Sequence, residues 1–179
     1  MSTSDTLRQF FENDDGSLPE VEISFENFND TVHVFEYLCS LGSRDVTAGG
    51  GNLWSIADQV SIPFPGAVAA SMVVAGVVTS FHVVLGGVTY AGIELPNLGV
   101  FFTPACIVID YRMGNDWSSE KIQTFITLLS KFSSMGGTVS VPWWYSEGER
   151  AFNHALKEAQ KHSAVANPAF KRDALKRAP

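Results

Sequence analysis

The sequence predicts an α+β fold, with a largely antiparallel sheet of about five to six strands flanked by about three helices. Three observations lead to this prediction. Several short stretches either alternate apolar and polar residues or are rich in Val and Ile, as strands are. Other stretches repeat apolar residues at helical spacing. The expected strands also follow one another through the middle of the chain instead of alternating with helices, which favours antiparallel pairing.

The length of 179 residues, 45% of them hydrophobic, corresponds to one domain whose core is large enough to need no disulfide. The last 30 residues hold seven basic and two acidic residues. We therefore place a single α+β domain at residues 1–162 and treat residues 163–179 as a basic C-terminal tail.

The N-terminal part is expected to form an arm, a strand and a helix. The first 19 residues are typical of a frayed arm or a short helix, which Asp14-Asp15-Gly16 and Pro19 would close. The strand alternates apolar with acidic or polar residues, namely Val21, Ile23 and Phe25 against Glu20, Glu22 and Ser24. The helix would use Asn27 as its N-cap and Gly42 as its C′ residue. Its expected apolar face consists of Phe28, Val32, Phe35, Leu38 and Cys39.

The middle of the chain is expected to supply most of the strands. Residues 43–52 are typical of a loop, residues 53–62 of a strand ended by Pro63, and residues 67–75 of either a short buried helix or a strand. Residues 77–85 and 88–95 predict a hairpin about Gly86-Gly87. Residues 100–103 and 105–112 predict two further strands, with Pro104 at an edge or bulge.

Two more helices are expected in the last third. The first would be capped by Asp116, end at Gly136-Gly137 and bury one face, made of Ile122, Phe125, Ile126, Leu129 and Phe132. A short strand with Val139 and Val141 follows. The pattern from Ser146 to Glu149 has the form of a capping box, and it precedes a third helix with Ala151, Phe152, Ala155, Leu156 and Ala159 on its apolar side.

The net charge of −7 is concentrated at the N-terminus, because residues 1–66 hold 11 acidic and two basic residues. A surface of this sign repels phosphate backbones, so we expect no nucleic-acid partner. Two interpretations of the acidity remain open, namely solubility and steering toward a basic partner.

Residues 59–93 contain no Asp, Glu, Lys or Arg, and the stretch is longer than the roughly 20 residues that a membrane helix needs. Its two prolines, its glycines and its Val, Thr and Ile content favour buried strands, so we expect no membrane partner. If the stretch forms an exposed sheet face, a homo-oligomer is possible. No signal-like segment is visible at the N-terminus, and the expected location is cytoplasmic.

Candidate chemistry is sparse. Cys39 and Cys106 belong to no CxxC or Cys/His cluster, and no nucleophile signature accompanies any Ser or Cys. We therefore expect no metal, no cofactor and no enzyme activity. An alternative is a small enzyme or ligand-binding domain with its pocket near Asp110, Arg112 and His82. Because Arg112 follows Asp110 by two residues on the same strand face, a simple Asp–Arg pair is the expected arrangement there.

One segment resembles a pattern of bacterial immunity proteins of polymorphic toxin systems. It runs from Ile107 to Ile122 (IVIDYRMGNDWSSEKI) and continues into FITLLSKF, with a strand ending in Asp-Tyr-Arg, a Gly turn and a Trp at a helix entry. The segment FENFNDTVHVFEYLCSLG is similar to a helix that such proteins carry near their start. The resemblance implies a small, acidic, cytoplasmic protein that binds one cognate toxin protein and blocks its active site. It implies no catalytic residues, and it transfers no interface.

Two groups of residues are the candidates for partner binding. The acidic group would steer or contact a basic partner, and it consists of Asp14, Asp15, Glu20, Glu22, Glu26 and Asp30. The aromatic group would supply apolar anchors, and it consists of Trp143, Trp144 and Tyr145. Adjacent aromatic residues in an extended segment point to opposite faces, so one of the two tryptophans is expected to face solvent. Burial of both beneath the third helix is the alternative.

Overall fold

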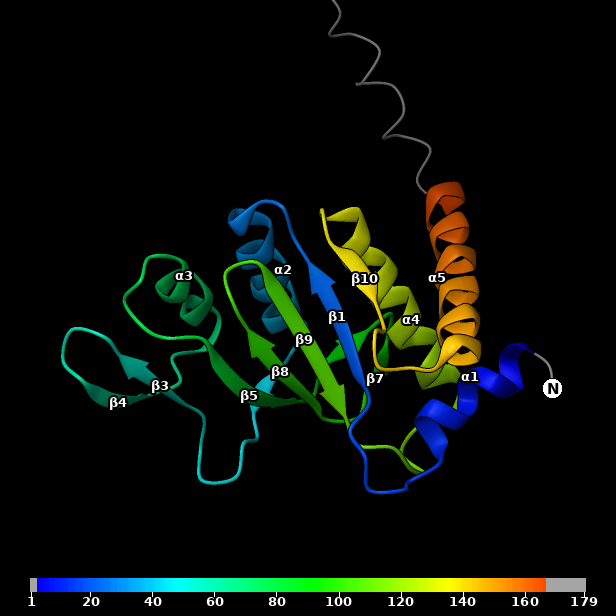
Figure 1. The fold of residues 1–179 in the computed structure, drawn as a ribbon, viewed down its shortest axis with the longest axis horizontal. Helices are drawn as coiled ribbons and strands as arrows, with labels where there is room; N and C mark the ends of the chain where they lie inside the picture. Colours follow the sequence, from blue (N-terminus) through cyan, green and yellow to red (C-terminus); the bar gives the residue numbers. More distant parts are fainter. Residues whose placement is uncertain (1–2, 167–179) are drawn as a thin grey trace, which may run out of the picture.

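The computed structural model describes residues 3–166, and it shows an antiparallel sheet with helices on one side (Figure 1). The sheet has six strands. In spatial order they are β10 (Thr138–Ser140), β1 (Glu20–Ser24), β9 (Cys106–Tyr111), β8 (Leu98–Phe102), β5 (Phe81–Gly86) and β2 (Arg44–Asp45). Every neighbouring pair is antiparallel. The predicted α+β class and antiparallel sheet are confirmed.

The described residues form five α-helices, two more than the approximate number predicted. They are α1 (Thr3–Glu12), α2 (Phe28–Ser40), α3 (Ala69–Val74), α4 (Ser119–Ser134) and α5 (Ser146–Ala166), with a 3₁₀ turn η1 (Gly66–Val68) before α3. Residues 67–75 are therefore helical, which settles the choice left open above. Helix α5 continues four residues past the predicted domain boundary at 162, and residues 167–179 of the basic tail lie outside the described residues. No helix in the described range is long and apolar enough to cross a bilayer.

Only one face of the sheet is buried. Along β1 and β9 every second residue points to this side, so that Val21, Ile23, Ile107 and Ile109 have no exposed surface. Helices α2 and α4 lie behind this face (Figure 1) and contribute fully buried side chains such as Phe35 and Phe125. The strict two-residue alternation means that the remaining side chains of these strands point to the opposite side.

Helix α2 begins where expected but buries a different face. The Asn27 side chain accepts a hydrogen bond from the Asn29 N–H, as an N-cap should, and Gly42 has the positive φ of a C′ residue. The buried residues are Thr31, Val34, Phe35 and Leu38. Phe28 is half exposed, while Val32 and Cys39 are only partly buried. The predicted face is therefore right at Phe35 and Leu38, but the buried stripe is rotated by about one position toward Thr31 and Val34.

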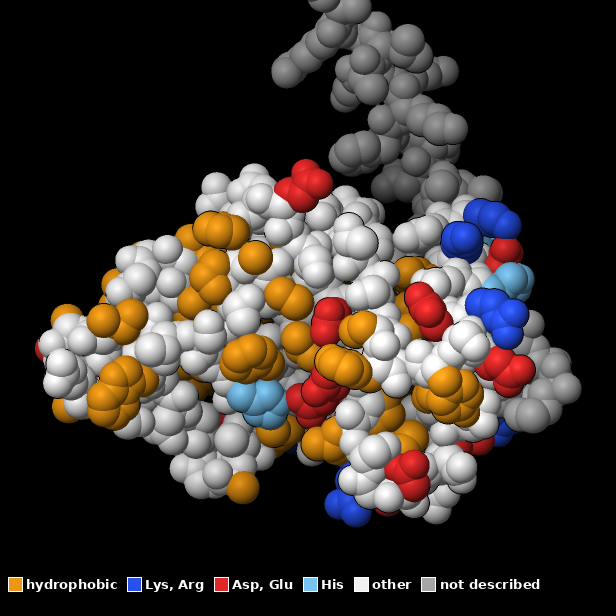
Figure 2. Space-filling model, in the orientation of Figure 1, with side chains coloured by type: hydrophobic (Ala, Val, Ile, Leu, Met, Phe, Trp, Pro, Cys, Tyr) orange, Lys and Arg blue, Asp and Glu red, His pale blue; other side chains and the backbone are white. Residues whose placement is uncertain are grey.

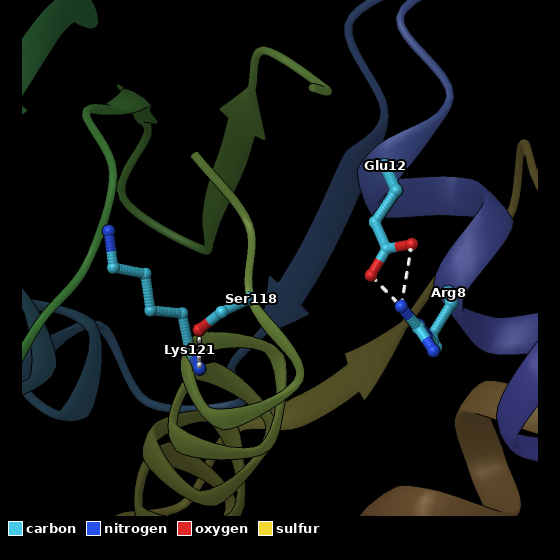
Figure 3. A network of polar contacts seen from close by, with 4 residues as sticks. All are labelled: Arg8, Glu12, Ser118 and Lys121. Atoms are coloured by element: carbon cyan, nitrogen blue, oxygen red, sulfur yellow. Dashed lines mark hydrogen bonds and ion pairs between the residues drawn. The ribbon is translucent and has the colours of Figure 1, made fainter. Parts of the chain in front are cut away.

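Helix α4 is capped by Ser118 and not by Asp116. The Ser118 side chain accepts a hydrogen bond from the Lys121 backbone N–H at 3.2 Å, while the Lys121 side chain extends away from the cap (Figure 3). The predicted apolar face of this helix is buried as expected. Figure 3 also shows the ion pair of α1, in which the Arg8 guanidinium binds the Glu12 carboxylate.

The segment between α2 and β8 differs most from the prediction. Residues 53–62 do not form one strand, because β3 (Asn52–Ser55) and β4 (Val60–Pro63) form a hairpin around Gln59, whose φ is +54°. The predicted hairpin about Gly86-Gly87 is also wrong. Strand β5 pairs instead with β8 and β2. The strands β6 (Thr89–Tyr90) and β7 (Ile93–Glu94) pair with each other through a turn at Ala91 and Gly92, both with positive φ.

An aromatic cluster holds α1 against the end of β9 and the start of α4. The rings of Phe11 and Tyr111 are stacked at 4.9 Å, and Trp117 and Phe125 pack edge-on against Phe11. The Tyr111 hydroxyl donates to the Phe10 carbonyl at 3.0 Å, and the Trp117 Nε1–H donates to the Arg112 carbonyl at 2.9 Å. Tyr111 of the Asp-Tyr-Arg strand end and the following Trp117 are therefore core residues, and they hold the C-terminal half of α1 in place.

Candidate functional site

One side of the sheet faces solvent, and we call it the open face. It consists of the outward residues of β1, β9, β8 and β5, which lie in two cross-strand rows. The first row is Glu22, Val108, Phe101 and His82, and the second is Glu20, Asp110, Gly99 and Val84. Phe101 at its centre is 40% exposed. These four strands contain no Lys or Arg. Figure 2 views this side of the molecule and shows acidic, histidine and hydrophobic side chains intermixed on it.

A histidine and an aspartate meet on the open face across an intervening strand. The His82 Nε2 atom on β5 lies 2.7 Å from the Asp110 Oδ2 atom on β9, with β8 between them. The aspartate side chain lies over Gly99 of β8, where any Cβ atom would overlap its carboxylate. Glycine at position 99 is therefore a requirement of this contact, and the Gly99 backbone is buried beneath the carboxylate.

The expected Asp110–Arg112 pair is wrong. Asp110 binds His82, whereas the Arg112 guanidinium lies 3.6 Å from the Asp14 carboxylate. Strand β9 ends at Tyr111, so Arg112 follows the chain into the turn and leaves the open face. Of the three residues in the alternative pocket, the structure brings together His82 and Asp110 only.

A groove adjoins the open face at the end of β1, and we call it the aromatic groove. Its volume is about 640 Å³. It is lined by residues from α1, from the α1–β1 connection and from the segment before α5, together with Met113. Among the residues predicted to bind a partner, Asp15, Glu20, Trp143, Trp144 and Tyr145 line it. Because Glu20 belongs to both the groove and the open face, the two form one continuous surface.

The aromatic residues of the groove are fixed by α1 and α5. The rings of Phe10 and Trp144 are stacked, with centroids 4.3 Å apart and planes within 3°. Phe10 also lies against Gly148 in the first turn of α5, where a Cβ atom would overlap the Phe10 ring. Trp144 is only 5% exposed, and its Nε1–H has no hydrogen-bond acceptor among the described residues. Trp144 is therefore part of the groove's wall and not an exposed anchor.

Trp143 and Tyr145 are the exposed members of the aromatic triplet. Trp143 is 75% exposed and Tyr145 is 58% exposed, while the Tyr145 ring is tilted against Phe10 at a centroid distance of 5.0 Å. The expectation that one of the two tryptophans faces solvent is met by Trp143. Large exposed aromatic side chains of this kind are preferred anchors in protein interfaces.

The acidic residues of the surface differ in their local partners. Asp15 accepts a hydrogen bond from the Ser17 backbone N–H at 2.9 Å, and hydrogen bonds from Ser17 lower the pKa of Asp15. Asp14, although predicted to bind a partner, lies outside the aromatic groove, in a second groove where its carboxylate is 3.6 Å from the Arg112 guanidinium. Within residues 3–166, Glu20 and Glu22 form no hydrogen bond or ion pair through their carboxylates, so their charge is available to a partner.

Not all of the predicted acidic residues lie at this surface. Glu26 follows the other end of β1, and Asp30 lies in the first turn of α2 beside Gly136. Neither lines the aromatic groove or belongs to the open face. Glu26 and Asp30 are acidic and close in sequence to Glu20 and Glu22. They nevertheless follow the C-terminal end of β1, whereas the aromatic groove lies at its N-terminal end.

Sequence reasoning missed the apolar residues of the surface outside the aromatic triplet, and three of them are prominent. Phe10 and Leu18 line the groove, and Phe101 is the apolar centre of the open face. Leu18 is 56% exposed although it is followed directly by Pro19 and a half-buried strand. The only signal in the sequence was that Phe101 and Gly99 occupy the outward positions of a strand in which a polar residue is the usual choice.

No group of three or more His, Cys, Asp or Glu residues in the described range is placed to hold a metal ion. No protein-family model matches the chain, and no match was found among curated proteins or solved structures.

Proposed function

We propose that this protein is an inhibitor of the immunity type, which binds a cognate toxin protein through the open face and the aromatic groove and so blocks the toxin's active site. The observation that carries the proposal is the position of Trp143 and Tyr145. They stand exposed at a groove whose charged lining residues, Asp15 and Glu20, are both acidic. The resemblance of residues 107–122 to immunity proteins supports the same function.

The surface has the composition of a protein interface rather than that of a solvated sheet face. Interfaces combine aromatic anchors with a polar rim, and few residues supply most of the binding energy. Here the anchors lie beside acidic residues, and Phe101 adds an apolar centre on the sheet. Active sites that act on nucleic acids are basic, so an acidic surface of this kind is complementary to them.

The test is a capture experiment followed by an inhibition assay. The tagged protein is used to isolate its partner from the source organism, in parallel with a Trp143→Ala/Tyr145→Ala double variant. Trp54→Ala is the matched control, because Trp54 is 48% exposed but lies on β3, at the opposite end of the molecule from α1 (Figure 1). The toxic activity of the captured protein is then measured with increasing amounts of each variant.

We expect the wild-type protein and the Trp54→Ala control to suppress that activity at equimolar ratio. The double variant should bind at least about 30-fold more weakly, since the loss of one hot-spot aromatic residue costs about 2 kcal/mol or more. A captured partner whose activity is unaffected by the wild-type protein contradicts the proposed function.

The hydrogen bond between His82 and Asp110 favours a second candidate, a small enzyme or ligand-binding domain. A histidine oriented by a carboxylate is a common general base. Asp110→Asn separates the two functions. In an enzyme this change abolishes turnover and leaves partner capture intact. In an inhibitor neither the wild-type protein nor the variant has any turnover, because the protein makes and breaks no bond.

A further inference from the structure

We propose that the aromatic groove is a receptor for an arginine side chain of the bound protein. The inference rests on the proposed function and specifies its chemistry, because it states which partner group enters the groove. Three features of the groove support it: exposed aromatic rings, carboxylates without a local cation, and an apolar wall.

The aromatic rings suit a planar cation. Trp143 and Tyr145 are both more than half exposed and line the groove together. A guanidinium group stacks on such rings through cation–π attraction, and tryptophan is the strongest partner for it. Arginine is favoured over lysine at such sites because its head group is planar and more weakly hydrated.

The carboxylates supply the opposite charge. Asp15 and Glu20 line the groove, and hydrogen bonds from Ser17 favour the ionised form of Asp15. A carboxylate binds a guanidinium through two parallel hydrogen bonds, which gives both affinity and orientation. The groove lining contains no Lys, Arg or His.

Two other grooves of the molecule contain basic residues beside their carboxylates. A second groove contains four acidic residues, Asp14, Glu94, Asp116 and Glu120, but Arg112 and Lys121 line it as well. A third contains Glu36 and Asp45 together with Arg44. Of these three grooves, only the aromatic groove presents carboxylates with no basic residue in its own lining.

The wall of the groove fits the aliphatic part of an arginine. Leu18, Pro19 and Met113 line it beside the stacked pair of Phe10 and Trp144. Long basic side chains commonly lay their methylene groups on apolar surface and keep the charged end among polar atoms. The groove therefore offers a separate contact to each part of an arginine side chain.

The experiment uses three blocked tripeptides as probes, with arginine, lysine or citrulline as the central residue. Citrulline has nearly the shape of arginine without its charge. Each is titrated into the ¹⁵N-labelled full chain while the indole N–H resonances are followed, with Trp143→Phe used to assign the relevant signal. We expect saturable shifts of the Trp143 resonance with the arginine peptide, and binding about tenfold weaker with citrulline. Lysine should be intermediate.

A charge-matched pair of variants completes the test. Asp15→Asn/Glu20→Gln should weaken binding of the arginine peptide about tenfold, whereas Glu26→Gln/Glu36→Gln changes the net charge equally at positions outside the groove and should leave it unchanged. Equal binding of the arginine and citrulline peptides, or equal effects of the two variants, would overturn the arginine receptor. Inhibition of the captured toxin by wild-type protein would then still stand, so the two proposals fail separately.

Discussion

Gly99 and Asp110 form the most specific side-chain arrangement on the open face. The carboxylate reaches His82 only because the strand between them has no Cβ atom at that point. We predict that Gly99→Ala lowers the free energy of unfolding by about 1–3 kcal/mol, since it forces the aspartate aside. In an Asp110→Ala background the same change should be nearly neutral. Urea unfolding of the four proteins measures the coupling, and an equal cost in both backgrounds would contradict the arrangement.

Comparison of Trp117 with Trp144 measures how much the hydrogen bond of a buried indole N–H contributes to the free energy of unfolding. Both are almost fully buried in aromatic surroundings. The Trp117 N–H donates to the Arg112 carbonyl, whereas the Trp144 N–H has no acceptor among the described residues. We predict that Trp117→Phe is more destabilising than Trp144→Phe by about 1–3 kcal/mol, because an unsatisfied buried donor is itself costly. Equal losses in thermal or urea unfolding would contradict this assignment.

At the scale of the element, the start of α4 tests which residue caps the helix. Ser118 accepts the Lys121 N–H, while Asp116 lies outside the helix in the preceding turn. We predict that Ser118→Ala lowers stability by about 1 kcal/mol. Asp116→Ala should change it by less than about 0.5 kcal/mol, as exposed substitutions usually do. The reverse order of the two losses in urea unfolding would restore Asp116 as the cap.

The local spacing of apolar residues correctly predicted the elements in which that spacing is regular. Strand β1 and helix α4 follow directly from their apolar spacing. Prediction failed where the turn residue is unusual or a distant strand competes. Gln59 turns a hairpin with a positive φ that glutamine rarely adopts, and β5 pairs with β8 instead of the nearer residues 88–95.

The candidate site was predictable in its residues but not in its assembly. The charge pattern and the aromatic triplet indicated Asp15, Glu20, Trp143 and Tyr145. Their convergence depends on Phe10 meeting Trp144, a contact between residues 134 positions apart. No local rule encodes such a contact, and the same limitation explains why Glu26 and Asp30 were grouped with residues at the other end of the strand.

On the scale of the whole molecule, burial of ionisable groups predicts a loss of stability at alkaline pH. Burial raises the pKa of the Cys39 thiol from 9.0 to about 11, and burial likewise raises the pKa of Tyr111 well above its usual value. The folded state therefore holds these protons more tightly than the unfolded state. The stability that Cys39 contributes is complete below pH 9 and is lost as the pH rises toward 11, whereas the stability that Tyr111 contributes is lost only above its ordinary pKa of 10.0.

Cys39→Ala isolates the thiol's share of this effect. At pH 10, one unit above its ordinary value, the wild-type protein should have lost about 1 kcal/mol more than the variant, relative to their stabilities at pH 8. Urea unfolding under reducing conditions measures the free energy of unfolding of both proteins. The contribution of Tyr111 is the same in the two proteins and drops out of the difference between them. Parallel loss of stability in the two proteins would contradict the assignment to Cys39.

The central claim is that the open face and the aromatic groove form one acidic binding surface. The most direct test is the binding kinetics of the captured toxin with two triple variants of equal charge. The first variant changes Asp15, Glu20 and Glu22 to Lys. The second variant changes Glu26, Asp30 and Glu36 to Lys. We predict that the first slows association about tenfold or more and weakens affinity further, while the second leaves affinity within about threefold. Equal losses in the two variants would show that net charge alone acts, and would contradict the surface proposed here.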